Sequence, residues 1–372
     1  MDILDILDRL VAFPSVVGRP NADIVAWIAA HARGCGARVV HLPGPEGDRA
    51  NLLISIGPAG APGHVLSGHM DVVPAEEPGW QADPFRLRRE AGRLIGRGTT
   101  DMKGFLAAAL SCLPELAARP LTAPVHLAFS YDEEAGCRGV PHLIARLPDL
   151  IAPPLGVIVG EPSGMRAILA HKGKAAAQAR ATGLPGHSSR PDLARNAIHG
   201  LSRVLAAAVD ASAALERGPQ DATFSPAWST LQVGMIGGGQ AVNVIPDQAS
   251  LTLEARAIWG VDPAGLLAPV RAALEALAAE GYGVAWQPIS AYPPLRLPPD
   301  APLATRLARL TGAPPLGAVS YGTEAGLYQA AGHDAIICGP GDIARAHTPE
   351  EFITEAELHR CRGMILRLAE PC

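Results

Sequence analysis

HVLSGHMDVVP, residues 64–74, is an apolar run that ends in a histidine and an aspartate two positions apart. Short apolar runs bounded by turn residues are typical of buried β-strands. Similar runs occur at NLLISIG (51–57), PVHLAFSY (124–131) and LGVIVGEP (155–162), with helical patterns between some of them. This alternation predicts an α/β domain with a mostly parallel sheet flanked by helices.

The alternation changes between residues 174 and 290, where strand and helix patterns follow in the order βαββα. This order predicts a small α+β domain inserted into the larger one. The larger domain then comprises residues 1–173 and 291–372, and its second joint, AYPPLRLPP (291–299), is proline-rich, as interdomain linkers often are. Two domains are also what a chain of 372 residues favours.

Composition and charge argue against several classes of partner. The net charge is −5, aromatic residues make up 4%, and basic residues form no block, so we expect neither nucleic acid nor a membrane surface as a partner. The six cysteines are scattered without a C-x-x-C pair, which favours reduced thiols. The N-terminal MDILDILDRLVAF has the spacing of an amphipathic helix and not of a signal peptide, so we expect a cytoplasmic protein.

Histidines and carboxylates follow four of the apolar runs in the larger domain. They are His69 and Asp71, then Asp132, Glu133 and Glu134, then Glu161, and finally His347 after DAIICGP (334–340). Asp101 joins them from the turn GRGTTDMKG, which opens a helix. In open α/β sheets, ligands bind beyond the carboxyl ends of the strands, so these side chains should meet at one edge.

Such a donor set suits Zn²⁺, Co²⁺ or Mn²⁺. Two of these ions can share a carboxylate and activate a water molecule between them. Each residue alone also has an ordinary interpretation: Asp101 as a helix N-cap, Glu133 and Glu134 as a solvated acidic pair, and His347 as a surface histidine. The convergence of all of them on one edge favours a metal site.

Six motifs in order extend this interpretation to the whole chain. They are SGHMDVVP, GRGTTDMKG, DEEAG, GEP, GHSSRP and AHTPEEF. The sequence resembles the M20 metallopeptidase and deacylase family over essentially its full length. The resemblance implies a zinc-exopeptidase-like catalytic domain, a lid and dimerisation domain at residues 174–290, a homodimer, and two divalent metal ions, with Zn²⁺ preferred and Co²⁺ as an alternative.

The resemblance also implies a role for each matching residue. The metal ligands would be His69, Asp101, Glu134, Glu161 and His347, with Asp101 bridging both ions. Asp71 would orient His69, as a carboxylate behind a ligating histidine commonly does. Glu133 would be the general base. His187 of GHSSRP would stabilise the oxyanion, reaching across from the partner subunit.

Two further stretches suggest a substrate. VSYGTEAGLYQAAG (319–332) and CGPGDIARAHTPEEFI (338–353) resemble the acetylornithine deacetylase branch, which implies conversion of N-acetyl-L-ornithine to L-ornithine and acetate in arginine biosynthesis. Asn243 and Arg256 match positions that contact substrate in the family, and a guanidinium suits a carboxylate. Glu324 would face the substrate amine, or else simply occupy the first turn of a helix capped by Thr323.

Other functions stay open at this point. Glu254 and Arg345 depart from the commoner aspartate and glutamine of the branch, which weakens the assignment of the acyl group. A related deacylase, acting on N-acetylcitrulline or succinyl-diaminopimelate, or a dipeptidase is the alternative within the hydrolases. A non-catalytic, metal-dependent binding protein could dispense with Glu133 and His187, yet both are present.

Overall fold

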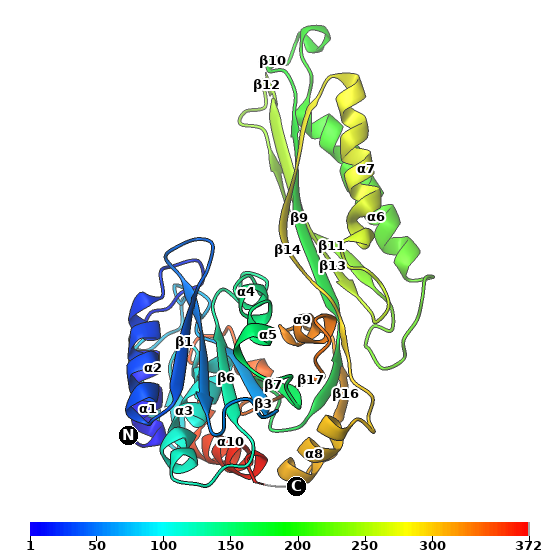
Figure 1. The fold of residues 1–372 in the computed structure, drawn as a ribbon. Coiled ribbons are helices and arrows are strands. Elements are labelled where there is room, and N and C mark those ends of the chain that lie inside the picture. The colour runs from blue at the N-terminus through cyan, green and yellow to red at the C-terminus, as the bar shows by residue number, and fades with distance from the viewer. Residues whose placement is uncertain (371–372) are drawn as a thin grey trace. The chain divides into compact units, whose positions relative to one another are not determined.

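The computed structural model describes residues 1–370. The chain forms two compact units (Figure 1). The larger unit comprises Met1–Ala170, Arg296–Gly317 and the described residues from Thr323 onward, and the smaller comprises His171–Leu295 and Ala318–Gly322. The inserted unit therefore begins at residue 171 and ends at 295, where we expected 174 and 290, and a second short segment joins it.

The larger unit is built on a nine-stranded sheet in the order β1-β2-β6-β3-β7-β17-β8-β15, with β16 beside β8. The strands are β1 (Arg38–Pro43), β2 (Ala50–Ile56), β3 (His64–His69), β6 (Val125–Ser130), β7 (Gly156–Pro162), β8 (Ile168–His171), β15 (Leu295–Arg296), β16 (Leu316–Val319) and β17 (Ala335–Gly339). The central strands β6, β3, β7 and β17 run parallel. The predicted α/β class with a mainly parallel sheet is confirmed.

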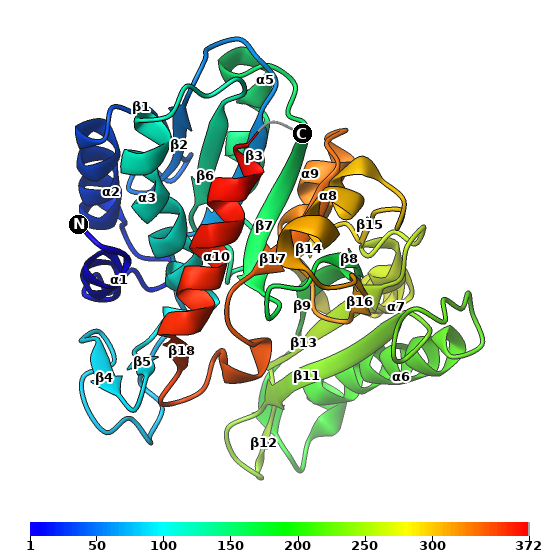
Figure 2. The same cartoon turned by 90° about the horizontal axis from the view of Figure 1, so that it is seen from below.

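Helices flank this sheet, and α3 and α10 run beside each other across it (Figure 2). The helices of the larger unit are α1 (Ile3–Val11), α2 (Ala22–Gly34), α3 (Gly104–Ala117), α4 (Val140–Ile144), α5 (Leu147–Leu150), α8 (Pro302–Thr311), α9 (Ala325–Ala330) and α10 (Glu355–Leu368). A small sheet of β4 (Arg88–Glu90), β5 (Arg93–Ile95) and β18 (Phe352–Thr354) completes it. Capping boxes open α1 at Asp2 and α10 at Thr354, which satisfies backbone N–H groups of the first turn.

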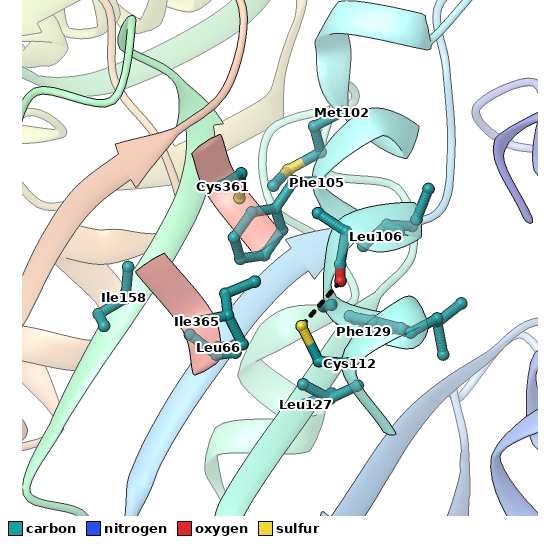
Figure 3. Close-up of a cluster of buried hydrophobic side chains, with 14 of the residues drawn as sticks. Leu66, Met102, Phe105, Leu106, Cys112, Leu127, Phe129, Ile158, Cys361 and Ile365 are labelled. Carbon is teal, nitrogen blue, oxygen red and sulfur yellow. Dashed lines mark hydrogen bonds between the residues drawn. The ribbon is translucent and has the colours of Figure 1, made fainter. Parts of the chain in front are cut away.

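The core under α3 holds the strand ends in place (Figure 3). α3 is apolar on almost every face because it packs between α1, α10 and the sheet. Leu66, Phe105 and Ile365 are fully buried there, and each such side chain contributes about 1.5–3 kcal/mol. Gly160 lets the Phe105 ring pack directly against β7, because a Cβ at position 160 would lie 2.1 Å from that ring. The residue after it is Glu161, so core packing fixes where this carboxylate emerges.

The smaller unit is a four-stranded antiparallel sheet in the order β11-β13-β9-β14. Its elements are β9 (Gly173–Thr182), α6 (Ala197–Leu215), β11 (Thr230–Gly238), β13 (Gln248–Ala257), α7 (Ala268–Ala276) and β14 (Gly283–Tyr292), with β10 (Gly186–His187) pairing β12 (Val244–Ile245). Both helices pack on the sheet (Figure 1). α6 alone among the helices of residues 1–370 is long and apolar enough for a membrane span by length and composition, and its Leu201 and Val204 belong to the packed core of this unit.

The observed order is βαββαβ, so the predicted order βαββα was one strand short. The missing strand is β14, an edge strand interrupted at Pro288 by a shift in register. Proline cannot donate to a sheet ladder and is tolerated at edges and bulges. The proline therefore masked a strand that the sheet nevertheless contains.

The chain leaves and re-enters the larger unit at neighbouring strands. β8 and β15 are adjacent in the sheet order, and the backbone N–H of Leu297 donates to the carbonyl of Leu169 over 2.7 Å. The two long joints of the insertion therefore lie side by side on one sheet.

Candidate metal centre

The expected metal ligands come together in the larger unit. His69 ends β3, Glu161 lies near the end of β7, and Glu134 follows β6. Asp101 lies in the segment η1 (Thr99–Lys103) before α3, where its own backbone is not helical, and His347 lies between β17 and β18. The parallel strands place their carboxyl ends at one edge, as the sequence pattern indicated.

Asp101 occupies the middle of this cluster. Its Oδ1 lies 3.1 Å from Nε2 of His69, and its Oδ2 lies 3.2 Å from Nε2 of His347. Glu161 Oε1 is 3.8 Å from the His69 ring nitrogen, and Glu134 Oε1 is 3.0 Å from that of His347. One carboxylate thus faces two histidines, each with a further carboxylate, which is the donor arrangement for two ions that share a bridge.

Asp71 supports two parts of this cluster at once. The Nδ1 atom of His69 lies 2.9 Å from the Asp71 carbonyl oxygen and 3.6 Å from its Oδ1. The Asp71 carboxylate also accepts the backbone N–H groups of Glu133 and Glu134, each over 3.2 Å. The sequence predicted a carboxylate behind His69, but the atom within hydrogen-bond distance of the ring is the Asp71 backbone carbonyl. The hydrogen bonds from Glu133 and Glu134 were not predicted, and through them Asp71 fixes the turn that carries the expected base and a ligand.

The cluster crowds carboxyl groups together, and Asp71, Asp101 and Glu161 among them are buried. Burial raises the pKa of Asp71 to about 7 and that of Glu133 to about 8. Burial and the charge of Asp101 raise the pKa of Glu161 well above its usual range. Hydrogen bonds to Asp101 and Glu134 raise the pKa of His347 to about 10. Without metal, these carboxyls and histidines hold protons that balance the crowded negative charge, and a divalent cation can supply that positive charge in place of the protons, so the residues fit the metal pair.

The chelated protein should therefore lose thermal stability as the pH rises from about 4 to about 8. Asp71 and Glu133, with pKa values of about 7 and about 8, hold protons in the folded state that they have already released when unfolded. Protons bound preferentially by the folded state stabilise it less as the pH rises. Added Zn²⁺ should remove the decline, because the positive charge of the metal lowers the pKa of both carboxyls and so removes their excess of protons in the folded state. Thermal denaturation with EDTA and with Zn²⁺ across this range measures it, and stability that rises with pH in EDTA would contradict it.

Glu324 does not lie where we expected a substrate contact. Its side chain is 1% exposed, and its two oxygens accept hydrogen bonds from Ser67 Oγ over 2.5 Å and Ser130 Oγ over 2.8 Å. A substrate amine would have to displace these serines from the interior. The carboxylate instead links the ends of β3 and β6, beside the buried hydroxyl of Tyr328 that also contacts Ser67.

The expected oxyanion residue His187 and two of the expected substrate residues, Asn243 and Arg256, lie in the smaller unit. His187 and Asn243 are neighbours, because β10 pairs β12 and the N–H of Ser188 donates to the Asn243 carbonyl over 3.1 Å. Arg256 lies toward the other end of the sheet, eight residues along β13 from Gln248, which is about 27 Å in an antiparallel strand. One smaller unit therefore cannot bring His187 and Arg256 to the same small molecule.

Two residues near the site were missed by the sequence analysis. The Cys137 thiol donates to Glu133 Oε1 over 3.2 Å, and the Glu351 carboxylate accepts the backbone N–H of Asp101 over 3.0 Å. Both stand within or next to motifs that were recognised, DEEAG and AHTPEEF. Their positions in those motifs were the available signal. A residue that supports a ligand from the interior, however, follows no sequence pattern that would identify it.

Known proteins resemble this chain in sequence and in fold. Residues 65–370 match Peptidase family M20/M25/M40. The chain is 31% identical over 371 residues to an acetylornithine deacetylase of Edwardsiella ictaluri, covering 96% of this chain and 94% of that protein. An M20 family metallo-carboxypeptidase from Sulfolobus solfataricus has a TM-score of 0.82 at 18% identity, covering 99% of both chains.

A third relative concerns the metals. A structure described as a dinuclear metal-binding peptidase of the M20 family, from Bacillus subtilis, has a TM-score of 0.68 at 14% identity and covers 99% of this chain and 96% of that chain. At this identity the likeness shows the fold. Together with the family match, these findings confirm the resemblance drawn from the six motifs. The chain belongs to peptidase family M20/M25/M40 and is a metallohydrolase.

Proposed function

We propose that the protein is an acetylornithine deacetylase, which hydrolyses N-acetyl-L-ornithine to L-ornithine and acetate in arginine biosynthesis. The observation that carries the hydrolytic part is Asp101, whose two oxygens face His69 and His347. The choice of substrate rests on the curated acetylornithine deacetylases, which are 30–31% identical over nearly the whole chain.

His69, Asp101, Glu134, Glu161 and His347 would hold two divalent ions, Zn²⁺ or alternatively Co²⁺. When bound, such ions polarise the scissile carbonyl and lower the pKa of water. Glu133 is half-buried, lies close to His69 and Glu161, and follows the same strand as Glu134. Its carboxylate takes the proton of the attacking water and passes it to the leaving amine. His187 donates a hydrogen bond to the oxygen on which negative charge develops.

Arg256 is the residue that we assign to the substrate carboxylate. Its guanidinium is held in place by Glu254, over 2.6 Å, and by the Tyr292 hydroxyl, over 3.2 Å. A guanidinium fixed in this way can present its remaining N–H groups to a carboxylate in a defined orientation. Asn243 is assigned to the substrate as well, whereas Glu324 is left out because its oxygens are engaged in the interior.

We further propose a cytoplasmic homodimer formed through the inserted unit. The separation of His187 from Arg256 within one smaller unit supports a site to which the partner contributes its own His187. β11 is an edge strand of the sheet, and Met235 and Ile236 on it are 69% and 58% exposed. Such an exposed edge is suited to pairing with another chain. The five cysteines among residues 1–370 are free thiols, which suits a reducing compartment; Cys372 lies outside the described residues.

Amine release by the Zn²⁺- or Co²⁺-loaded protein tests this function. The substrates are N-acetylornithine, N-acetylcitrulline, N-succinyl-diaminopimelate and a dipeptide, and we expect the highest kcat/KM on N-acetylornithine. A preference for another acyl amino acid or for the dipeptide would contradict the proposed substrate but would agree with the proposed hydrolase activity. The dipeptide is included because the solved structures with this fold include peptidases. If the protein hydrolysed none of the four compounds, the proposed function would be overturned.

A further inference from the structure

We propose that Glu351 is a positioning residue for Asp101, and that it shapes the turn from which this carboxylate reaches both histidines. The inference rests on the proposed two-metal function. Glu351 lies four residues after His347 and is 1% exposed. A buried carboxylate that stands between two stretches of ligand-bearing chain calls for a role beyond packing, because burying its charge is costly unless every lone pair is satisfied.

The Glu351 carboxylate gathers three backbone N–H groups of one turn. Oε1 accepts from Thr100 over 2.9 Å and from Asp101 over 3.0 Å, and Oε2 accepts from Gly98 over 3.0 Å. The Glu351 carbonyl also accepts the N–H of Gly96 over 2.9 Å. Residues 96–101 thus surround a single residue that is distant in sequence, with Gly98, Thr100 and Asp101 bound to its side chain and Gly96 to its backbone.

Arg97 balances the charge of this carboxylate. It is 1% exposed, and its Nη1 lies 3.0 Å from Glu351 Oε2. Its Nη2 donates to the carbonyl of Pro74 over 3.1 Å and pairs with Glu77. The pair therefore joins three segments: the one after His69 and Asp71, the turn before Asp101, and the one after His347.

Asp101 depends on this arrangement because its backbone is not helical. Its φ and ψ are −122° and 92°, although α3 begins only three residues later. In that conformation its N–H donates to the Glu351 carboxylate. The same constraint fixes the direction of the Asp101 side chain. A glutamine at 351 has the same shape, yet its amide N–H₂ would face N–H donors, leaving at least one of them unpaired.

Binding of Co²⁺ to the full-length protein, after its metal has been removed with a chelator, tests the proposal. Calorimetric titration measures the affinity, and the visible spectrum of bound Co²⁺ reports on its ligands. Glu351→Gln should bind at least one Co²⁺ about 10–100-fold more weakly than the unmodified protein, with an altered spectrum, as is usual when a partner of a metal ligand is lost. Glu350→Gln is the matched control. It removes the adjacent carboxylate, which pairs with Arg88 and accepts from the Gln81 N–H, and should bind Co²⁺ normally.

Glu351→Asp provides the second variant, because it keeps the charge opposite Arg97 while drawing the carboxylate back from the turn. Glu351→Asp should fold, as judged by circular dichroism of the metal-free protein, and should also bind Co²⁺ more weakly. If Glu351→Gln does not fold, the affinity of Glu351→Asp for Co²⁺ tests the positioning role. Folded variants with unchanged affinity and spectrum would overturn the positioning role. If the unmodified protein bound no Co²⁺, the two-metal function itself would fail.

Discussion

Glu133→Gln should lower kcat by about 10²–10⁴-fold and leave the metal content unchanged. Glutamine keeps the size of the side chain but cannot accept the proton of the attacking water. Glu133 is half-buried, and its Oε1 accepts a hydrogen bond from Cys137, so the substitution should disturb little else. Steady-state kinetics with the preferred substrate, together with the metal content per chain, measures the effect.

Glu134→Gln is the matched control, because it changes the neighbouring residue in the same way. Glu134 Oε1 lies 3.0 Å from the His347 ring nitrogen, so this variant should lose metal affinity, and excess metal should restore part of its rate. Excess metal should not rescue Glu133→Gln. Loss of metal from Glu133→Gln would instead identify Glu133 as a ligand, a role its closeness to His69 and Glu161 permits.

His69→Ala should abolish high-affinity metal binding and with it the activity. The ring lies 3.1 Å from Asp101 and 3.8 Å from Glu161 and is almost fully buried, so water cannot replace it in an equivalent position. Asp71→Asn should retain much of the metal while losing about 10–100-fold in affinity or rate. The reason is that the asparagine amide would face the N–H groups of Glu133 and Glu134, which the carboxylate now accepts.

Metal content by atomic emission and the rate with saturating metal separate the two variants. An exposed histidine in β1, His41, gives the control His41→Ala, which should match the unmodified protein in both measurements. Equal loss of metal from His69→Ala and Asp71→Asn would contradict the assigned division between a ligand and its support.

The strand ends were predictable because parallel strands deliver their following residues to one edge. His69, Glu161 and the acidic pair after β6 each follow an apolar run, and apolar runs are visible in one sequence. Glu351 was not predictable in this way, since its partners lie about 250 positions away and only the folded chain brings them together. Glu324 shows the opposite difficulty: a charged residue in a recognised motif suggested the substrate, whereas packing placed it in the interior.

The neighbouring joints of the insertion have a consequence for how such a chain can evolve. Because the backbones of Leu169 and Leu297 are hydrogen-bonded to each other where the chain departs and returns, residues 171–295 form an insertion that begins and ends at neighbouring strands. The strands that carry His69, Glu134 and Glu161 are all complete before residue 171. A lineage can therefore lengthen, reshape or exchange the inserted segment without rebuilding the strands that supply these three ligands.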